Sequence, residues 1–102
     1  MLSGKVRNME SAKGNKVANQ FIITEEGRGA LGNFTKRETF QSYDSVIAIK
    51  TEWVGEIEVI LDSHYWNYSR TTSKYRSEFL GESTKETQKR IDDGIYKLAN
   101  LN

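Results

Sequence analysis

The stretch SVIAIKTEWVGEIEVILD, residues 45–62, constrains the fold of this chain more than any other. Its VIAI run is typical of a strand that is buried on both faces. After Gly55, the segment EIEVILD places Ile57, Val59 and Leu61 at every second position, as on one face of a strand. Gly55 can supply the turn between the two runs. This stretch therefore predicts a β-hairpin.

Two further strands are predicted before the hairpin. QFIITEE, residues 20–26, is rich in the β-branched and aromatic residues that favour strands. NFTKRETFQSY, residues 33–43, places Phe34 and Phe40 an even number of positions apart. We therefore expect an antiparallel sheet of three to four strands between about residues 17 and 62.

The hydrophobic period then changes and predicts a helix over residues 70–80. Ser69 can accept a backbone N–H as the N-cap, and Gly81 suits the left-handed residue that follows a helix. Tyr75 and Phe79 lie one turn apart on the same side. The sheet is thus followed by a helix with an apolar face.

A second short helix begins at a capping box, STKE at residues 83–86, and should end near Gly94. The last segment, IYKLANLN, has two interpretations. It adds a short edge strand, or it packs its apolar residues under the sheet: Ile95, Leu98 and Leu101. The predicted fold class is α+β, with an antiparallel sheet followed by two short C-terminal helices.

The first 15 residues are polar and show no sustained apolar period. We expect residues 1–15 to form a flexible or partner-ordered polar arm, and residues 16–102 to form a single α+β domain. The chain has 102 residues, which is the size of one small domain with one core.

Composition excludes several classes of function. Fifteen Lys and Arg residues against fourteen Asp and Glu leave a net charge of +1, so any electrostatic recognition must be local. Without cysteine, and with His64 as the one histidine, the chain lacks the usual ligands of a metal site. No signal peptide or membrane-spanning run is present, and we expect a cytoplasmic protein without cofactors or metals.

The segment EEGRGALGN, residues 25–33, contains the spacing G-x-G-x-x-G at Gly27, Gly29 and Gly32. A dinucleotide loop needs a strand before this motif and a helix after it. Here a strand-like stretch follows, so we interpret the segment as a hairpin loop that relies on the permissive backbone of glycine. Arg28 could still contact a partner from this loop.

No catalytic constellation is found. Asp62, Ser63 and His64 are the residue types of a triad, but consecutive residues of an extended segment point in alternating directions. We interpret them as a solvated turn. The adjacent pairs Glu25–Glu26 and Asp92–Asp93 do not converge on a reacting atom. The sequence therefore predicts a protein that is not an enzyme.

HYWNYSRTTSKYR, residues 64–76, interleaves aromatic rings with cations and holds no acidic residue. One interpretation is nucleic-acid binding, in which cations meet phosphates and rings stack on bases. The other is structural: the larger rings are core contacts at the strand-to-helix junction and the cations are solvated. Residues predicted to bind a partner are Arg28, Lys36, Arg37, Tyr68, Arg70, Lys74 and Arg76.

FQSYDSVIA, residues 40–48, and YWNYSRTTSKYRSEFLG, residues 65–81, resemble a family of small, mostly uncharacterised proteins of bacteriophages and other mobile elements of Gram-positive bacteria. The similarity runs from about Asn19 to the C-terminus, and the first 18 residues look particular to this chain. The resemblance brings no catalytic residue with it.

The resemblance implies a setting, because short non-enzymatic phage proteins often bind and disable a host machine. We therefore expect a phage-encoded binding protein that inhibits a host defence complex, in the first place a CRISPR effector nuclease. Its partner would be a host protein or a nucleoprotein complex, without a membrane. The alternative is a small DNA- or RNA-binding regulator that uses residues 65–76.

Overall fold

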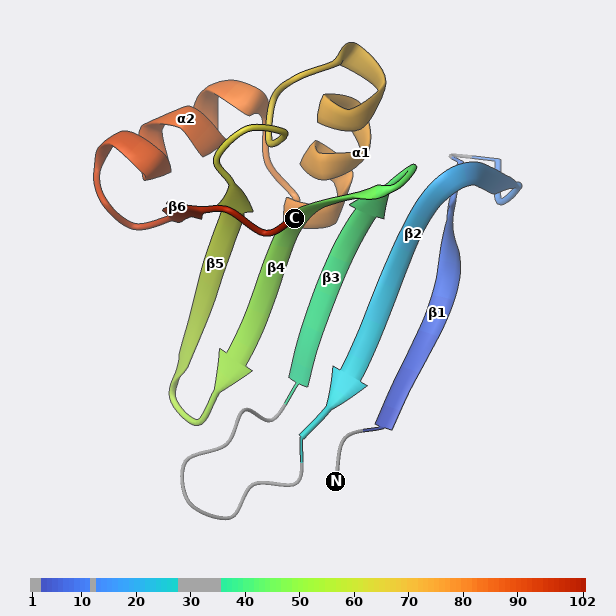
Figure 1. Cartoon of the computed structure of the whole chain (residues 1–102), viewed down its shortest axis with the longest axis horizontal. Coiled ribbons are helices and arrows are strands. Elements are labelled where there is room, and N and C mark those ends of the chain that lie inside the picture. Colours follow the sequence, from blue (N-terminus) through green and yellow to red (C-terminus); the bar gives the residue numbers. More distant parts are fainter. Residues whose placement is uncertain (1–2, 12, 28–35) are drawn as a thin grey trace.

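The computed structural model describes residues 3–11, 13–27 and 36–102. In this part of the chain five strands are followed by two helices and a short last strand (Figure 1). The strands are β1 (Ser3–Glu10), β2 (Lys16–Glu26), β3 (Lys36–Ser42), β4 (Ser45–Trp53), β5 (Glu56–Asp62) and β6 (Lys97–Ala99). The helices are α1 (Arg70–Leu80) and α2 (Thr84–Asp92).

The strands form one six-stranded sheet in the order β1-β2-β3-β4-β5-β6. Each of the first five pairs antiparallel with the next, and β6 pairs parallel with β5. The α+β class is confirmed, and so is the β4–β5 hairpin, whose Gly55 has a φ of 86°. The prediction of three to four antiparallel strands, however, understated a mixed sheet of six.

β1 is the main departure from the sequence analysis, which expected residues 1–15 to form a flexible or partner-ordered arm. Ser3–Glu10 pairs with β2 along its length. A bulge between Asn8 and Glu10 turns Met9 toward the helices, where it is 7% exposed. β1 is polar because its outer edge is open to solvent, so its sequence shows little of the apolar pattern by which strands are recognised.

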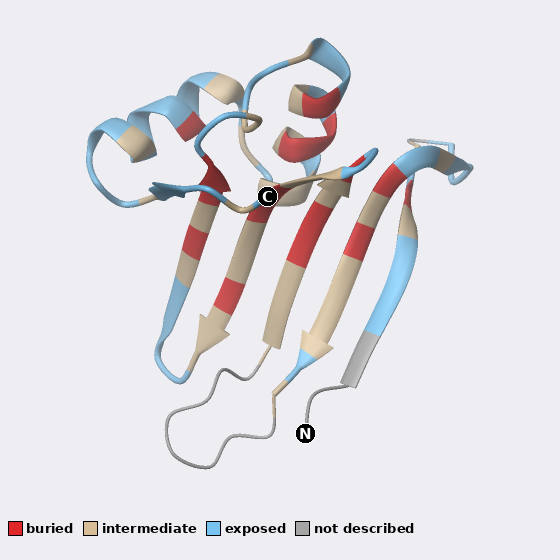
Figure 2. Ribbon diagram, viewed as in Figure 1, coloured by how far each residue is buried: buried red, intermediate tan, exposed pale blue. Residues whose placement is uncertain are grey.

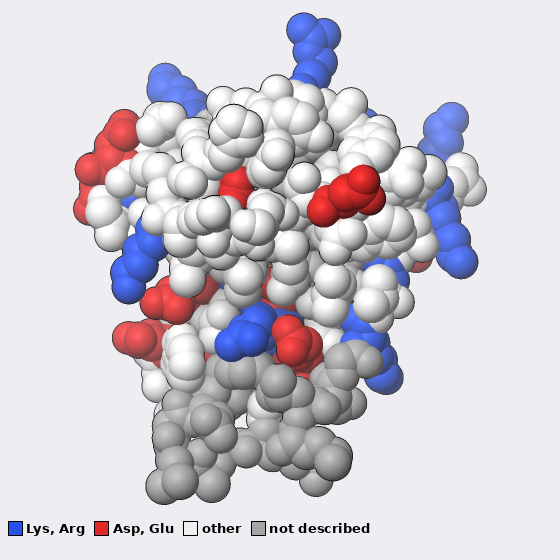
Figure 3. Space-filling model, viewed as in Figure 1, with Lys and Arg blue, Asp and Glu red and all other residues white. Residues whose placement is uncertain are grey.

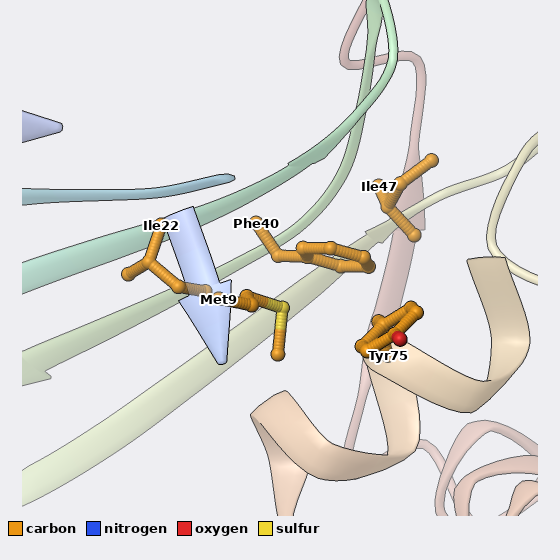
Figure 4. Packing of buried hydrophobic residues seen from close by; sticks show 5 residues of the cluster. All are labelled: Met9, Ile22, Phe40, Ile47 and Tyr75. Carbon is orange, nitrogen blue, oxygen red and sulfur yellow. The ribbon is translucent and has the colours of Figure 1, made fainter. Parts of the chain in front are cut away.

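Both helices pack on one face of the sheet, as predicted. Phe40 lies in the middle of a cluster with Met9, Ile22, Ile47 and Tyr75 (Figure 4). A second cluster joins strand residues to apolar residues from the helices and the segments beside them: Ala48, Val59, Leu61, Trp66, Phe79, Leu80, Ile91 and Tyr96. Figure 2 shows that buried residues gather mainly in the half of the sheet nearest the helices.

The predicted helix caps are confirmed. Ser69 Oγ accepts the N–H of Thr72 at 3.1 Å, and Gly81 takes the left-handed conformation with a φ of 70°. Ser83 and Glu86 form a reciprocal capping box, each accepting the other's backbone N–H at 3.1 Å. These local contacts explain why the helix boundaries follow so closely from sequence.

The C-terminal segment takes the first of its two predicted forms, a short edge strand. Leu98 pairs with Leu61 of β5 and remains 44% exposed, so it does not pack under the sheet. Beyond β6, the side-chain amide of Asn102 donates to Val46 O at 3.0 Å and accepts from Val46 N at 2.8 Å. The Asn102 side chain thus makes the two hydrogen bonds to the Val46 backbone that a neighbouring strand would make at the start of β4. Among the described residues, no helix has the length and apolar character that a membrane crossing needs.

Candidate binding surfaces

The sheet face opposite the helices carries a row of four apolar residues around a central threonine, Thr39, which is 8% exposed. Ile22, Phe40, Ala48 and Leu61 pair directly across the sheet and face the helices. The residues beside them form a second row on the opposite face, in the order Val6, Ile23, Thr39, Ile49 and Ile60. We call this the open face, because both helices lie on the other side of the sheet.

The open face is unusual for an antiparallel sheet, whose solvated side is ordinarily polar. Its three isoleucines are half-buried, and Val6 at the β1 edge is 67% exposed. A neighbouring row adds Phe21 and Val46, paired with Gln41 of β3. The row on the other side is polar and includes an ion pair between Arg37 and Glu25 at 4.0 Å. An apolar centre with a polar border is the usual anatomy of a protein interface.

Lys36 and Arg37 were predicted to extend the basic surface of α1, but the structure places them at the other end of the sheet. β3 begins at Lys36 and ends beside α1 (Figure 1). Lys36 Nζ lies 3.8 Å from Glu38 and Arg37 lies 4.0 Å from Glu25, so carboxylates already neutralise both cations. These two residues do not join Arg70 and Lys74.

Arg76 was predicted on the same exposed face as Arg70 and Lys74, and this prediction of its position is wrong. Its side chain is completely buried. The guanidinium donates to Trp66 O and to Thr84 Oγ1, each at 2.6 Å, and lies 5.1 Å from the Trp66 ring centre. Burial lowers the pKa of Arg76 and nearby Glu82 opposes that shift. Arg76 therefore joins the 65–69 segment, α1 and the start of α2.

The exposed cations and tyrosine of the predicted segment do lie together at the start of α1. Arg70 and Lys74 are exposed one helical turn apart, and Lys74 Nζ lies 5.2 Å from the Tyr75 ring centre. Tyr68, immediately before the cap, is 50% exposed with its ring against Tyr65. The structural interpretation of the larger rings is confirmed, because Tyr65, Trp66, Tyr75 and Phe79 all pack in the two core clusters.

Sequence reasoning missed Tyr43, which lies beside this surface. Tyr43 and Asp44 form the two-residue turn between β3 and β4, and Tyr43 has a φ of 54°. Its side chain is 49% exposed. The neighbouring Ser42 contacts Thr72 of α1 through their hydroxyl oxygens at 2.9 Å. The dipeptide YD between two strands is a turn signal, but only the backbone angle shows which residue is strained.

Arg28 and the segment 28–35 lie outside the described residues, so the interpretation of the glycine motif as a hairpin loop is not tested. β2 before this segment and β3 after it pair antiparallel from Glu26 and Lys36 onward. The element after this segment is a strand, β3, whereas a dinucleotide loop requires a helix there.

Asp62 has a structural role in the turn after β5. Its buried carboxylate accepts the backbone N–H groups of His64, Tyr65 and Leu101 at 2.8–3.1 Å. Burial pushes the pKa of Asp62 up, but the hydrogen bonds outweigh burial and hold that pKa below its ordinary value. The carboxylate thus fixes the turn after β5 and the C-terminal segment at once.

A second buried carboxylate ties the two helices to the last segment. Glu82 accepts the Tyr96 hydroxyl and the Thr87 hydroxyl, the latter at 2.9 Å, and its carboxylate lies 3.4 Å from Arg90 Nε. Burial and the adjacent Glu82 raise the pKa of Tyr96 well above its ordinary value. The described residues contain no group of three or more His, Cys, Asp and Glu placed to hold a metal ion.

The fold and its surfaces define a small α+β domain with a six-stranded sheet that is covered by helices on one face. Residues 4–94 match a family of unknown function, DUF8033, and the chain belongs to this family. The match includes β1, so the expectation that the first 18 residues are particular to this chain was wrong. Neither curated proteins nor solved structures gave a match.

Proposed function

We propose that the chain is a non-enzymatic binding protein that covers part of a protein partner with its open face. The observation that carries this proposal is the apolar row from Val6 to Ile60 on a sheet whose helices are all on the other side. Val6 of this row is exposed and its isoleucines are half-buried, and an apolar patch with a polar border marks interaction sites in soluble proteins.

The size of the open face suits such an interface. Five strands spaced about 4.8 Å apart, over about seven residues at 3.3 Å per residue, cover about 550 Å² on one side. Together with an equal area on the partner this reaches about 1,100 Å², which clears the lower limit of about 1,000 Å² for a specific interface. A single strand edge or hairpin tip would offer much less.

The electrostatics of the open face favour a protein over a nucleic acid. Arg37 is held by Glu25, and at the other border Lys97 Nζ lies 3.4 Å from Glu58. Lys and Arg side chains bind nucleic acid by displacing the counterions condensed on its phosphates, and Arg37 and Lys97 are already paired with carboxylates. A partner with an apolar centre and few charges fits the face best.

Capture from a lysate followed by a binding measurement tests the proposal. The variant Ile23→Lys/Ile49→Lys places two charges in the middle of the open face. Its matched control, Ile57→Lys/Ile95→Lys, makes the same change at isoleucines that are 64% and 58% exposed elsewhere. Each protein captured by the parent is purified and titrated against all three chains, after melting curves have shown that they are folded.

We expect the open-face variant to bind the captured partner at least about tenfold more weakly, since buried unpaired charges are costly, and the control to bind like the parent. Equal affinities for the two variants would refute the open face as the contact surface. If the parent sediments as a dimer and the open-face variant as a monomer, the partner on the open face is a second copy of the chain instead.

The resemblance to phage and mobile-element proteins suggests a target class, a host defence complex such as a CRISPR effector nuclease. The same capture experiment tests this finer proposal. An inhibitor should be recovered together with a nuclease or another defence protein, and should lower the cleavage rate of that nuclease. Recovery of partners that belong to no defence complex would contradict the target class and leave the contact surface untouched.

A further inference from the structure

The two-residue turn between β3 and β4 holds Tyr43 at a positive φ. Two-residue hairpin turns that need a positive φ favour Asn and Gly, and a bulky residue there is an outlier. Tyr43 adopts a φ of 54° although its ring is 49% exposed. Its backbone is held by two hydrogen bonds, because its N–H donates to Asn19 O at 2.7 Å and its carbonyl accepts from Gln41 Nε2 at 2.8 Å, so the ring itself is not needed for the turn. Strained residues that packing does not require are candidates for function.

A second exposed tyrosine, Tyr68, precedes the helix that the β3–β4 turn contacts. The hydroxyls of Ser42 and Thr72, 2.9 Å apart, join the β3–β4 turn to the first turn of α1. Tyr68 stands immediately before that turn of the helix and is 50% exposed. Two half-exposed rings thus flank the start of α1.

Cations of α1 and of the β1–β2 hairpin border this end of the molecule, together with Asp44 in the same turn as Tyr43 and Glu10 opposite Lys16. No ion pair between described residues involves Arg70, Lys74, Lys13 or Lys16. Lys13 and Lys16 belong to the β1–β2 hairpin, whose Val17 packs on the cluster that contains Tyr75. Lys74 Nζ lies 5.2 Å from the centre of the Tyr75 ring. Figure 3 shows Lys and Arg side chains projecting from the molecule, including at the end that carries the helices.

We infer that Tyr43, Tyr68, Arg70 and Lys74, with Lys13 and Lys16 at the border, form a binding surface for single-stranded nucleic acid. We call it the tyrosine–lysine surface. Unpaired bases stack on exposed aromatic rings regardless of sequence, and the backbone phosphates follow a line of cations. A duplex keeps its bases stacked inside and would leave both tyrosines unused. This surface does not depend on the proposed role of the open face.

Fluorescence anisotropy with labelled oligonucleotides of about 16 nucleotides tests the inference. Single-stranded DNA, single-stranded RNA and duplex DNA are titrated with the full chain at about 50 mM and about 200 mM salt. With four phosphate contacts, the logarithm of the affinity should fall by about 2.8 per decade of salt, a loss of about fiftyfold between the two conditions. Both single strands should bind more tightly than the duplex.

Three variants separate a specific surface from general attraction. Tyr43→Gly should weaken binding about tenfold, the loss of one stacked base, while glycine's tolerance of positive φ keeps the melting temperature at or above that of the parent. Arg70→Gln/Lys74→Gln should weaken binding and flatten the salt dependence. Lys36→Gln/Arg37→Gln removes the same charge at the other end of the sheet and should have little effect.

Three results would overturn the inference. The first is no binding of any oligonucleotide at low salt. The second is an equal loss of affinity in the two double variants, which would mean diffuse electrostatic attraction. The third is tight binding of a polyglutamate peptide with no binding of single strands, which would assign the surface to an acidic protein segment.

Discussion

A single buried guanidinium connects three segments of this chain. Arg76 lies in α1. Its guanidinium donates to the carbonyl of Trp66, which precedes α1, and to the hydroxyl of Thr84, which begins α2. The guanidinium has the planar, multi-donor geometry for such bridging, and a lysine ammonium does not. The hydrogen bonds that Arg76 makes to the 65–69 segment and to α2 therefore depend on the identity of this one residue.

Replacing Arg76 by Met should destabilise the fold by about 3 kcal/mol, because the Trp66 carbonyl and the Thr84 hydroxyl would stay buried without their donor. Arg76→Lys should recover only part of the loss. The exposed Arg70→Met is the control and should change the free energy of unfolding by less than about 0.5 kcal/mol. Urea unfolding measures all three, and equal losses in Arg76→Met and Arg70→Met would contradict the buried role.

Asp62 makes the stability of the protein depend on pH. Because its folded pKa is held below the ordinary value of 3.8, its contribution is fully present above that value and is lost as the pH falls through the lower folded pKa. Asp62→Asn lacks the ionised acceptor and should be less stable than the parent at pH 7. The difference should shrink as the pH falls below 3.8 and through the lower folded pKa of Asp62.

Urea unfolding of the two proteins at several pH values checks this prediction. Asp44→Asn, in the exposed β3–β4 turn, is the control, and its difference from the parent should be small throughout. A gap between Asp62→Asn and the parent that stays constant from pH 7 into acid would show that the charge of Asp62 is not what stabilises the fold.

At the scale of elements, the predictable ones were those with local signals. Caps fixed α1 and α2, and apolar runs revealed β2, β4 and β5. β1 was not predicted as a strand. Among its described side chains only Met9 is buried, through a bulge, and polar residues occupy most of the other positions. Arg76 was misplaced for a different reason, because the prediction grouped the cations by charge alone. Arg76 lies one turn after Thr72 and three residues before Phe79, so helical spacing puts it on the inward side of α1.

β4 lies inside the sheet, between β3 and β5, and its residue Ile47 tests this placement. Ile47 has no exposed surface and packs with Phe40 and Tyr75. Ile47→Asp would place a carboxylate among them and should cost at least about 4 kcal/mol. Val54→Asp at the tip of the same hairpin, where the side chain is 87% exposed, should cost less than about 0.5 kcal/mol.

Circular dichroism and thermal melting of the two variants measure this contrast. An Ile47→Asp variant that melts together with Val54→Asp would show that β4 is not buried between its neighbours and the helices. Both substitutions add the same group to the same hairpin, so propensity alone cannot produce the expected difference.

At the scale of the whole molecule, covering the sheet on one side separates two candidate surfaces. The helices occupy one face and bring α1 beside the β3–β4 turn, which assembles the tyrosine–lysine surface. The opposite side is left with the isoleucine row of the open face. Residues far apart in sequence meet in both surfaces, so neither was visible from motifs, although Arg70, Lys74 and Tyr68 were found from the sequence.

Because the two surfaces lie on different sides of the sheet, a change in one should not disturb the other. Ile23→Lys/Ile49→Lys should lose the captured protein partner and keep the oligonucleotide affinity of the parent within about twofold, since substitutions more than about 10 Å apart act additively. Tyr43→Gly should show the reverse. Anisotropy titrations and partner binding, measured on the same preparations, give the four numbers. If either variant weakens both interactions while its melting temperature is unchanged, the two ligands share one surface, and the separation argued from the sheet is wrong.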